Sequence, residues 1–174
     1  METEFTRLLL GRDLRRLKNV NKVLDAVPSQ ESFDDLFALV FHHDRSLVMR
    51  AADAVEKITV RNKHYLQPHK AQLLAILKSA DHKELKWHIA QLLPRLPLTK
   101  EEVDRVWHQL TYWTLNRNES KIVRVNALQG LFDIWQSHPE LQRDFSQTLS
   151  VVERELIPSL QARVRKLRHQ MSGK

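Results

Sequence analysis

Histidine is the residue type in this sequence that could most readily do chemistry, because its nine histidines could act as acid–base groups or metal ligands. The densest groups are His42-His43-Asp44 and the pair formed by His64 and His69. Helical metal sites favour ligands at i and i+4, and a hydrolytic zinc site would read His-Glu-x-x-His. Neither pattern occurs in the sequence. We therefore predict no metal site and interpret these histidines as turn or surface residues.

Other catalytic groups are scarce in the sequence. The chain has no cysteine, which excludes a thiol nucleophile, a thiolate metal site and a disulfide. With only three glycines, a Gly-rich phosphate-binding loop is not expected. The adjacent carboxylates Glu101-Glu102 are explained by the capping of a helix. The sequence thus predicts a protein that is not an enzyme and that needs no cofactor.

The composition is that of one globular domain spanning residues 1–174, with 42% hydrophobic and 28% charged residues. No apolar run is long enough to cross a bilayer, and the N-terminal residues lack a signal-peptide pattern, so we expect a cytoplasmic protein. The net charge of +7 and the pI of about 9.9 leave room for an anionic partner. A solubilising surface charge is the simpler explanation.

One apolar pattern occurs three times at a spacing of 38 residues, beginning at Leu47, Leu85 and Val123. In the first copy its members are Leu47, Ala51, Ala52, Val55 and Ile58, and the residues 38 and 76 positions further on are apolar as well. These spacings place the members on one face of a helix. A period of this length is typical of an array of helical hairpins, so we predict an all-α fold.

Helix-start signals and prolines divide the chain into predicted repeats at residues 32–67, 68–98 and 99–136. The predicted start signals are Ser32 with Asp35, Asp44, Asp81 with Glu84, and Thr99 with Glu102. Pro94 removes a backbone donor and predicts that the helix of the second repeat ends or bends near Leu93.

The two ends of the chain, residues 1–31 and 137–174, are predicted to be atypical capping helices. The first end contains a basic amphipathic segment over residues 12–27. At the other end the spacing fails, because Gln161, 38 residues after Val123, is polar. A final helix is predicted from the apolar stripe Leu160, Val164, Leu167 and Met171. Such caps cover the exposed core at the ends of a repeat array.

The repeated stretches resemble a known repeat. The third reads Val123-Arg124-x-x-Ala127-Leu128-x-Gly130-Leu131-x-x-Ile134, and the first ends Ala51-Ala52-x-Ala54-Val55-x-x-Ile58. They resemble the second helix of HEAT repeats, whose pattern is close to V-R-x-x-A-A-x-A-L-x-x-L after an Asp-containing turn. Asp44 lies in that turn, and the family's arginine matches Arg124 and, as lysine, Lys86, whereas Val48 departs from it. The resemblance covers residues 32–136.

A HEAT-like fold implies an α-α superhelix, or solenoid, of antiparallel helix pairs in which the second (B) helices line the inner surface. HEAT proteins serve many partners, so the fold alone does not name one. HEAT-type iron-dependent hydroxylases would need paired His-Glu dipeptides, and the sequence has none. HEAT-like DNA glycosylases place tryptophans and an aspartate on the inner helices. Trp87 and Asp53 offer those residue types without a matching motif, which leaves this activity a remote option.

Polar residues between the apolar positions of the B helices are expected to face a partner. The predicted partner-binding surface comprises Arg50, Lys57, Arg61, Lys86, Trp87, His88, Arg95 and Arg124. Its charge is basic in the first two repeats and fades in the third. The sequence favours a non-enzymatic scaffold or adaptor that binds a protein. The alternative is a nucleic-acid-binding protein that holds phosphates along the basic side chains.

Overall fold

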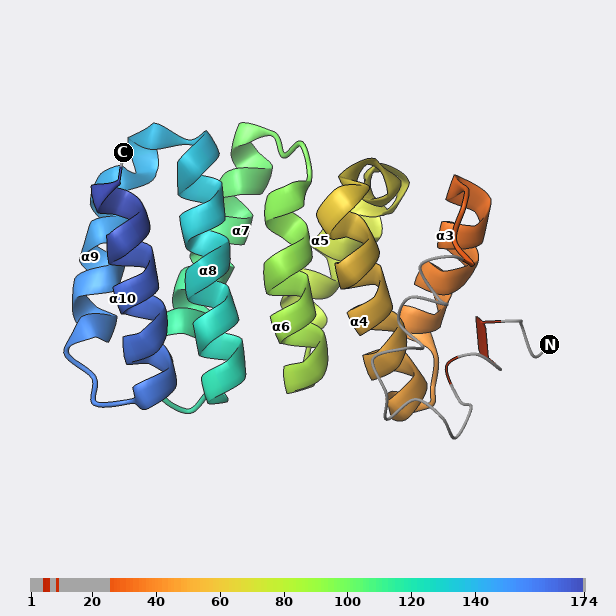
Figure 1. Cartoon of the computed structure of the whole chain (residues 1–174), viewed down its shortest axis with the longest axis horizontal. Coiled ribbons are helices and arrows are strands. Elements are labelled where there is room, and N and C mark those ends of the chain that lie inside the picture. The colour runs from red at the N-terminus through yellow and green to blue at the C-terminus, as the bar shows by residue number, and fades with distance from the viewer. Residues whose placement is uncertain (1–4, 7–8, 10–25, 174) are drawn as a thin grey trace. The chain divides into compact units, whose positions relative to one another are not determined.

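A computed structural model of the chain describes residues 5, 6, 9 and 26–173. All regular secondary structure in these residues is helical, so the predicted all-α class is confirmed (Figure 1). The predicted basic helix over residues 12–27 lies, apart from its last two residues, outside the described residues. The chain divides into two compact units, Met1–Pro68 and His69–Lys174, which we describe separately. None of the described helices is long and apolar enough to span a membrane.

The first unit contains the helix pair α3 (Gln30–Ala38) and α4 (Arg45–Arg61). Asp44 caps α4 as predicted, because its carboxylate accepts hydrogen bonds from the backbone N–H groups of Ser46 and Leu47 at 2.8 and 3.3 Å. The five apolar residues of the recurring pattern in α4, from Leu47 to Ile58, are all buried.

The start of α3 differs from the prediction. Its N-cap is Ser29, and Ser32 occupies the third helical position of a capping box that closes back on Ser29. The helix therefore begins before Ser32 and not at it. Phe33, Leu36 and Phe37 form its buried face.

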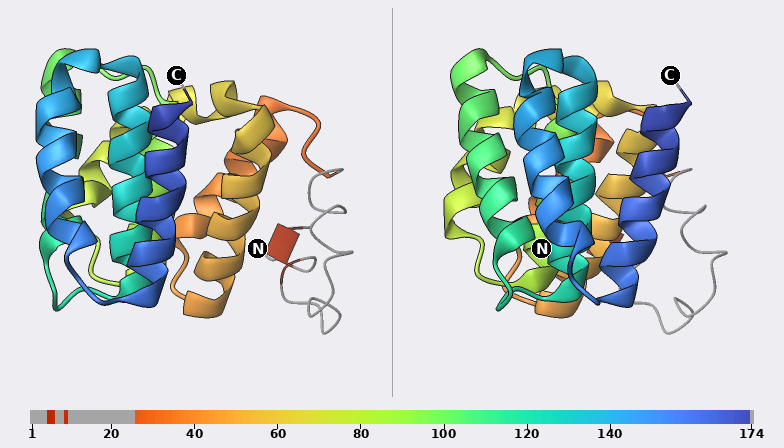
Figure 2. Two further views of the ribbon diagram at one scale, coloured as in Figure 1. Left: turned by 60° about the vertical axis from the view of Figure 1, so that its left-hand side comes forward. Right: turned by 90° about the vertical axis from the view of Figure 1, so that its left-hand side faces the viewer.

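The second unit consists of three antiparallel hairpins. Its helices are α5 (Lys70–Ser79), α6 (Lys83–Leu92), α7 (Lys100–Leu115), α8 (Lys121–Ser137), α9 (Gln142–Glu153) and α10 (Pro158–Ser172). Helices α6, α8 and α10 form one layer and α5, α7 and α9 the other (Figures 1 and 2). The first helix of each hairpin, which we call the A helix, therefore packs against the A helix of the neighbouring hairpin. The B helices pack against one another in the same way, which is the arrangement that the repeat pattern predicts.

The helix boundaries of the second unit follow two of the predicted signals. The Thr99 hydroxyl accepts a hydrogen bond from the Glu102 backbone N–H at 3.3 Å, and the Glu102 carboxylate accepts one from the Thr99 N–H at 2.7 Å. This capping box starts α7 as predicted. Pro94 ends α6 at Leu92 and leaves a short 3-10 turn, also as predicted.

The predicted cap of α6 is wrong. This helix begins after His82, and no side chain caps it, so Asp81 with Glu84 does not form a capping box. Asp81 lies one residue before the N-cap position, so its carboxylate cannot reach the free backbone N–H groups in the first turn of α6. The second repeat thus lacks the side-chain cap that α4, α7 and α8 have.

The repeated apolar positions form the core. All of them are buried except Leu85, which is half-buried at the start of α6. Gly130 lies where α8 packs closely against α6, because a Cβ atom built on it would lie only 2.5 Å from the Ala90 carbonyl oxygen. A glycine at this position of the pattern therefore permits close packing of two B helices.

The last hairpin stacks like the others although the 38-residue spacing fails there. Leu160 lies 37 residues after Val123, and α10 buries Leu160, Val164 and Leu167. With the same offset of 37 residues, the buried Leu128 and Leu131 of α8 correspond to two exposed arginines of α10, Arg165 and Arg168. Helix α10 is thus a B helix with a polar side. Its capping role stays a prediction.

Candidate interaction surfaces

The predicted surface residues of the first unit are all on α4. Arg50 is half-buried and donates a hydrogen bond from Nη1 to the Leu9 carbonyl oxygen at 2.5 Å. Lys57 forms an ion pair with Asp53, one turn earlier, at 2.5 Å. Arg61 is exposed at the last residue of the helix. Arg50 therefore contacts the backbone of Leu9, whereas Lys57 and Arg61 remain at the surface.

Two predicted surface cations of the second unit point between hairpins. Arg124 is only 1% exposed and forms a bidentate ion pair with Glu155, with Nη1–Oε2 and Nη2–Oε1 distances of 3.0 and 2.6 Å. Lys86 forms an ion pair with Glu119, and its ammonium lies 5.9 Å from the centre of the Trp113 ring. Both residues join neighbouring hairpins, so the prediction that Arg124 faces a partner is wrong.

The prediction that His88 faces a partner is wrong as well, because this residue lies on the buried side of α6 and is only 1% exposed. Helical phase explains the error, since His88 lies next to Ile89 on the buried side of the helix. Trp87 is half-buried and its ring stacks on that of His88 with centres 3.8 Å apart. Arg95 is half-buried beyond the end of α6. Trp87 and Arg95 therefore remain partly exposed to solvent.

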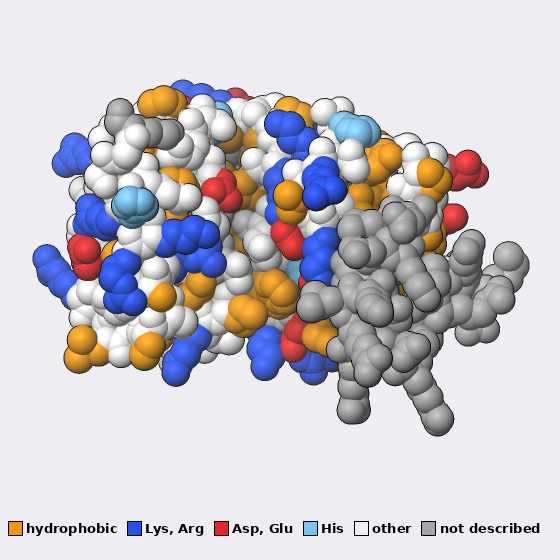
Figure 3. Space-filling view, in the orientation of Figure 1, with side chains coloured by type: hydrophobic (Ala, Val, Ile, Leu, Met, Phe, Trp, Pro, Cys, Tyr) orange, Lys and Arg blue, Asp and Glu red, His pale blue; other side chains and the backbone are white. Residues whose placement is uncertain are grey.

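Arg95 belongs to a polar cluster that runs from the 3-10 turn after α6 to the B helices α8 and α10, and we call this cluster the B-helix surface. Its members are Arg95, Gln129, Asp133, Arg163 and Lys166. Arg163 donates to the Gln129 side-chain oxygen at 2.5 Å, and the Gln129 amide donates to Asp133 at 2.8 Å. Lys and Arg side chains are spread over this face of α8 and α10 (Figure 3). Of these five residues, Arg95 belongs to the predicted partner-binding surface.

Asp133 is the carboxylate at the centre of the B-helix surface. Loss of hydration among the surrounding protein atoms raises its pKa above the ordinary 3.8, while the Gln129 hydrogen bond and the neighbouring cations oppose that rise. Asp133 keeps substantial contact with solvent, so we expect it to be ionised at neutral pH. The surface therefore displays one negative charge among three positive ones.

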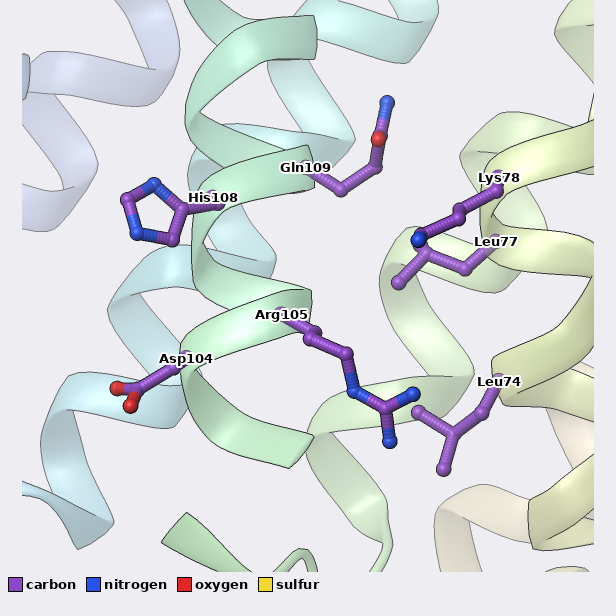
Figure 4. A pocket seen from close by; sticks show the side chains of 7 residues that line it. All are labelled: Leu74, Leu77, Lys78, Asp104, Arg105, His108 and Gln109. Carbon is purple, nitrogen blue, oxygen red and sulfur yellow. The ribbon is translucent and has the colours of Figure 1, made fainter. Parts of the chain in front are cut away.

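A second candidate surface lies in the A-helix layer, where sequence reasoning proposed none. A pocket of about 310 Å³ opens between α5 and α7. Leu74, Leu77 and Lys78 reach into it from α5, and Arg105 and Gln109 from α7 (Figure 4). Two further lining residues of α7, Asp104 and His108, point away from α5. The apolar pattern of the A helices predicts which residues are buried, but not where two helices diverge enough to leave a pocket.

The chemistry available at these surfaces is that of charge and hydrogen bonding. Within the described ranges, no three His, Cys, Asp or Glu side chains are placed to hold a metal ion. His42 and His43, the densest histidine pair in the sequence, stack on each other with ring centres 4.1 Å apart. The Nδ1 of His42 accepts a hydrogen bond from the Asp44 N–H at 3.0 Å, so this histidine supports the turn before α4.

Antiparallel helix pairs that stack in two layers define an α-solenoid repeat protein. The chain matches a family model described as HEAT repeat domain over residues 10–171. It therefore belongs to the HEAT repeat family, and its fold is that of a helical-repeat scaffold. Comparisons with curated proteins and with solved structures give no match.

Proposed function

We propose that this HEAT repeat protein is a non-enzymatic scaffold that binds a partner protein through the B-helix surface. The arrangement of Asp133 between Arg95, Arg163 and Lys166 carries the proposal. A protein partner presents charges of both signs and can match such a pattern, which gives specificity and register. A phosphate backbone would instead meet an unfavourable carboxylate at the centre of its contact.

We propose that Trp87 and Arg95 of the predicted surface contact the partner protein. On the first unit, the proposed contacts are Lys57 and Arg61. Trp87 contributes a half-exposed aromatic ring, a residue type enriched among the energetically dominant contacts of protein interfaces. We place the function in the cytoplasm, which the absence of cysteine supports.

Site-specific crosslinking tests the proposal, because a chain without cysteine accepts a single introduced one. Gln91→Cys places a benzophenone-maleimide label on α6 one turn before Arg95, and Gln142→Cys places it at the exposed start of α9. We expect a protein adduct from extracts of the native cells with the first variant only. Unlabelled wild-type protein should compete with the adduct. Equal labelling from both positions would count against the B-helix surface.

Nucleic acid is the alternative partner, and the charge of the second unit favours it. Residues 69–174 contain 17 Lys and Arg against 11 Asp and Glu, a net charge of +6 out of the total of +7. Asp133→Lys separates the two functions, because it should weaken the protein adduct but strengthen binding of a labelled oligonucleotide at low salt. Asp144→Lys, an equal charge change on an exposed residue of α9, is the matched control.

A further inference from the structure

We propose that the pocket between α5 and α7 is a second binding site, which takes a short acidic segment of a protein partner with one apolar side chain against its leucines. The site lies in the A-helix layer and is independent of the proposed function of the B-helix surface. The charges, the apolar floor and the size of the pocket favour this occupant.

The positive charges of the pocket come from both walls. Lys78 extends from α5 toward α7, and Arg105 extends from α7 toward α5 (Figure 4). Within the described part of the chain, neither side chain forms an ion pair. Asp104 also lines the pocket but points away from α5, and Glu102 interacts with Arg105 through charge alone (Figure 4). By contrast, Lys70, in the same interface, is bound by Glu102 at 2.8 Å. Lys78 and Arg105 are therefore positioned to bind an external carboxylate from two sides, and arginine can do so with two hydrogen bonds.

The floor between these cations is apolar. Leu74 is half-buried and Leu77 is buried, and both side chains point from α5 toward α7 (Figure 4). Gln109 adds an amide that can both donate to and accept from a peptide backbone. The volume of about 310 Å³ is at the small end of the range of about 300–1,000 Å³ for ligand pockets. It therefore fits one or two side chains of a peptide and not a whole cofactor.

The same lining disfavours nucleic acid as the occupant. Sites for single-stranded nucleic acid combine cations with aromatic rings on which bases stack. No Phe, Tyr or Trp lines this pocket, and the ring of His108 points away from the space between α5 and α7 (Figure 4). A leucine floor flanked by two cations instead complements a segment that carries both leucine-type and glutamate-type side chains.

The test is an NMR titration of the full-length, ¹⁵N-labelled protein with a synthetic peptide that repeats Leu-Glu-Glu. We expect the amide signals of Leu74, Leu77, Lys78, Arg105 and Gln109 to shift, and those of α10 to stay in place. Lys78→Glu and Arg105→Glu should each weaken binding by roughly tenfold, because they set like charges against the peptide. Lys83→Glu makes the same charge change on α6 outside the pocket and should leave the affinity unchanged.

Two further probes make the outcome decisive. The same peptide with Gln in place of Glu should bind more weakly, and Leu74→Ala should lower the affinity without a change in charge. No shift of the pocket signals at millimolar peptide would overturn the proposal. So would a thymidine oligonucleotide that shifts these signals when the peptide does not. Because Lys78 and Arg105 are in the A-helix layer, their variants should keep the Gln91-directed crosslink, so either proposal can fail without the other.

Discussion

Arg124 and Glu155 lock two neighbouring hairpins together. The Arg124 guanidinium binds the Glu155 carboxylate through both Nη atoms, and its Nε donates to the Thr114 carbonyl oxygen at 2.8 Å. It thereby satisfies a free carbonyl in the last turn of α7 and holds the turn between α9 and α10. Lys86 and Glu119 repeat the relationship one hairpin earlier, with Glu119 lying 36 residues before Glu155. The basic residue of the HEAT pattern is therefore a structural connector between repeats.

Arg124→Met should lower the free energy of unfolding by about 3–5 kcal/mol, because it leaves the poorly exposed Glu155 carboxylate without its partner. The matched control is Arg168→Met. Arg168 pairs with Glu153, but the two side chains are 42% and 45% exposed, so its loss should cost under about 1 kcal/mol. Urea denaturation followed by circular dichroism measures both values. Similar losses for the two variants would contradict the connector role.

The same ion pair predicts how stability depends on pH. The hydrogen bonds from Arg124 lower the pKa of Glu155 below its ordinary value of 4.5. A carboxylate whose pKa is lower in the folded state stabilises the fold above the unfolded-state pKa, and this stabilisation is lost as the pH falls through the folded-state pKa. We therefore expect the wild-type melting temperature to drop below about pH 4.5 more steeply than that of Glu155→Gln. Parallel melting curves for the two proteins would refute this origin.

Helix type and repeat phase were predictable from sequence because they depend on local features. Apolar residues at helical spacing identify the buried face, and side chains such as Asp44 and Thr99 cap helices within a few residues of themselves. The cap at Asp81 failed for the same local reason, because a cap acts only at one position relative to the first turn.

The candidate surfaces were less predictable, because they depend on contacts between hairpins. The sequence alone suggests that Arg124 is a surface cation. Its burial is possible because Glu155 of the next hairpin forms an ion pair with it. Asp133 and Arg163 come together through Gln129 although 30 residues separate them in sequence. No spacing rule within one helix anticipates such contacts.

Gly130→Ala should destabilise the protein, although alanine is the better helix former by about 1 kcal/mol. The added Cβ would lie 2.5 Å from the Ala90 carbonyl oxygen and 3.0 Å from a methyl carbon of Leu110. Helices α6 and α8 would have to move apart, at a cost of about 1–3 kcal/mol. Gly173→Ala is the control, since its Cβ would make only an ordinary contact at 3.6 Å. Thermal melts of both variants test the prediction, and a stabilised Gly130→Ala would disprove the close approach.

Ala127→Glu should abolish cooperative folding of the second unit. Ala127 is fully buried in α8, and Arg124, one turn earlier, is already paired with Glu155, so a glutamate at position 127 would be an ion without a free counter-charge in the core. The loss should exceed about 4 kcal/mol, which is the range of the most damaging substitutions. Asn126→Glu introduces the same residue one position earlier, where the side chain is half-exposed and donates a hydrogen bond to the Ile122 carbonyl oxygen. We expect this control to stay folded by circular dichroism and to keep a single melting transition. If Asn126→Glu unfolded while Ala127→Glu did not, the phase of the repeat on α8 would be off by one residue.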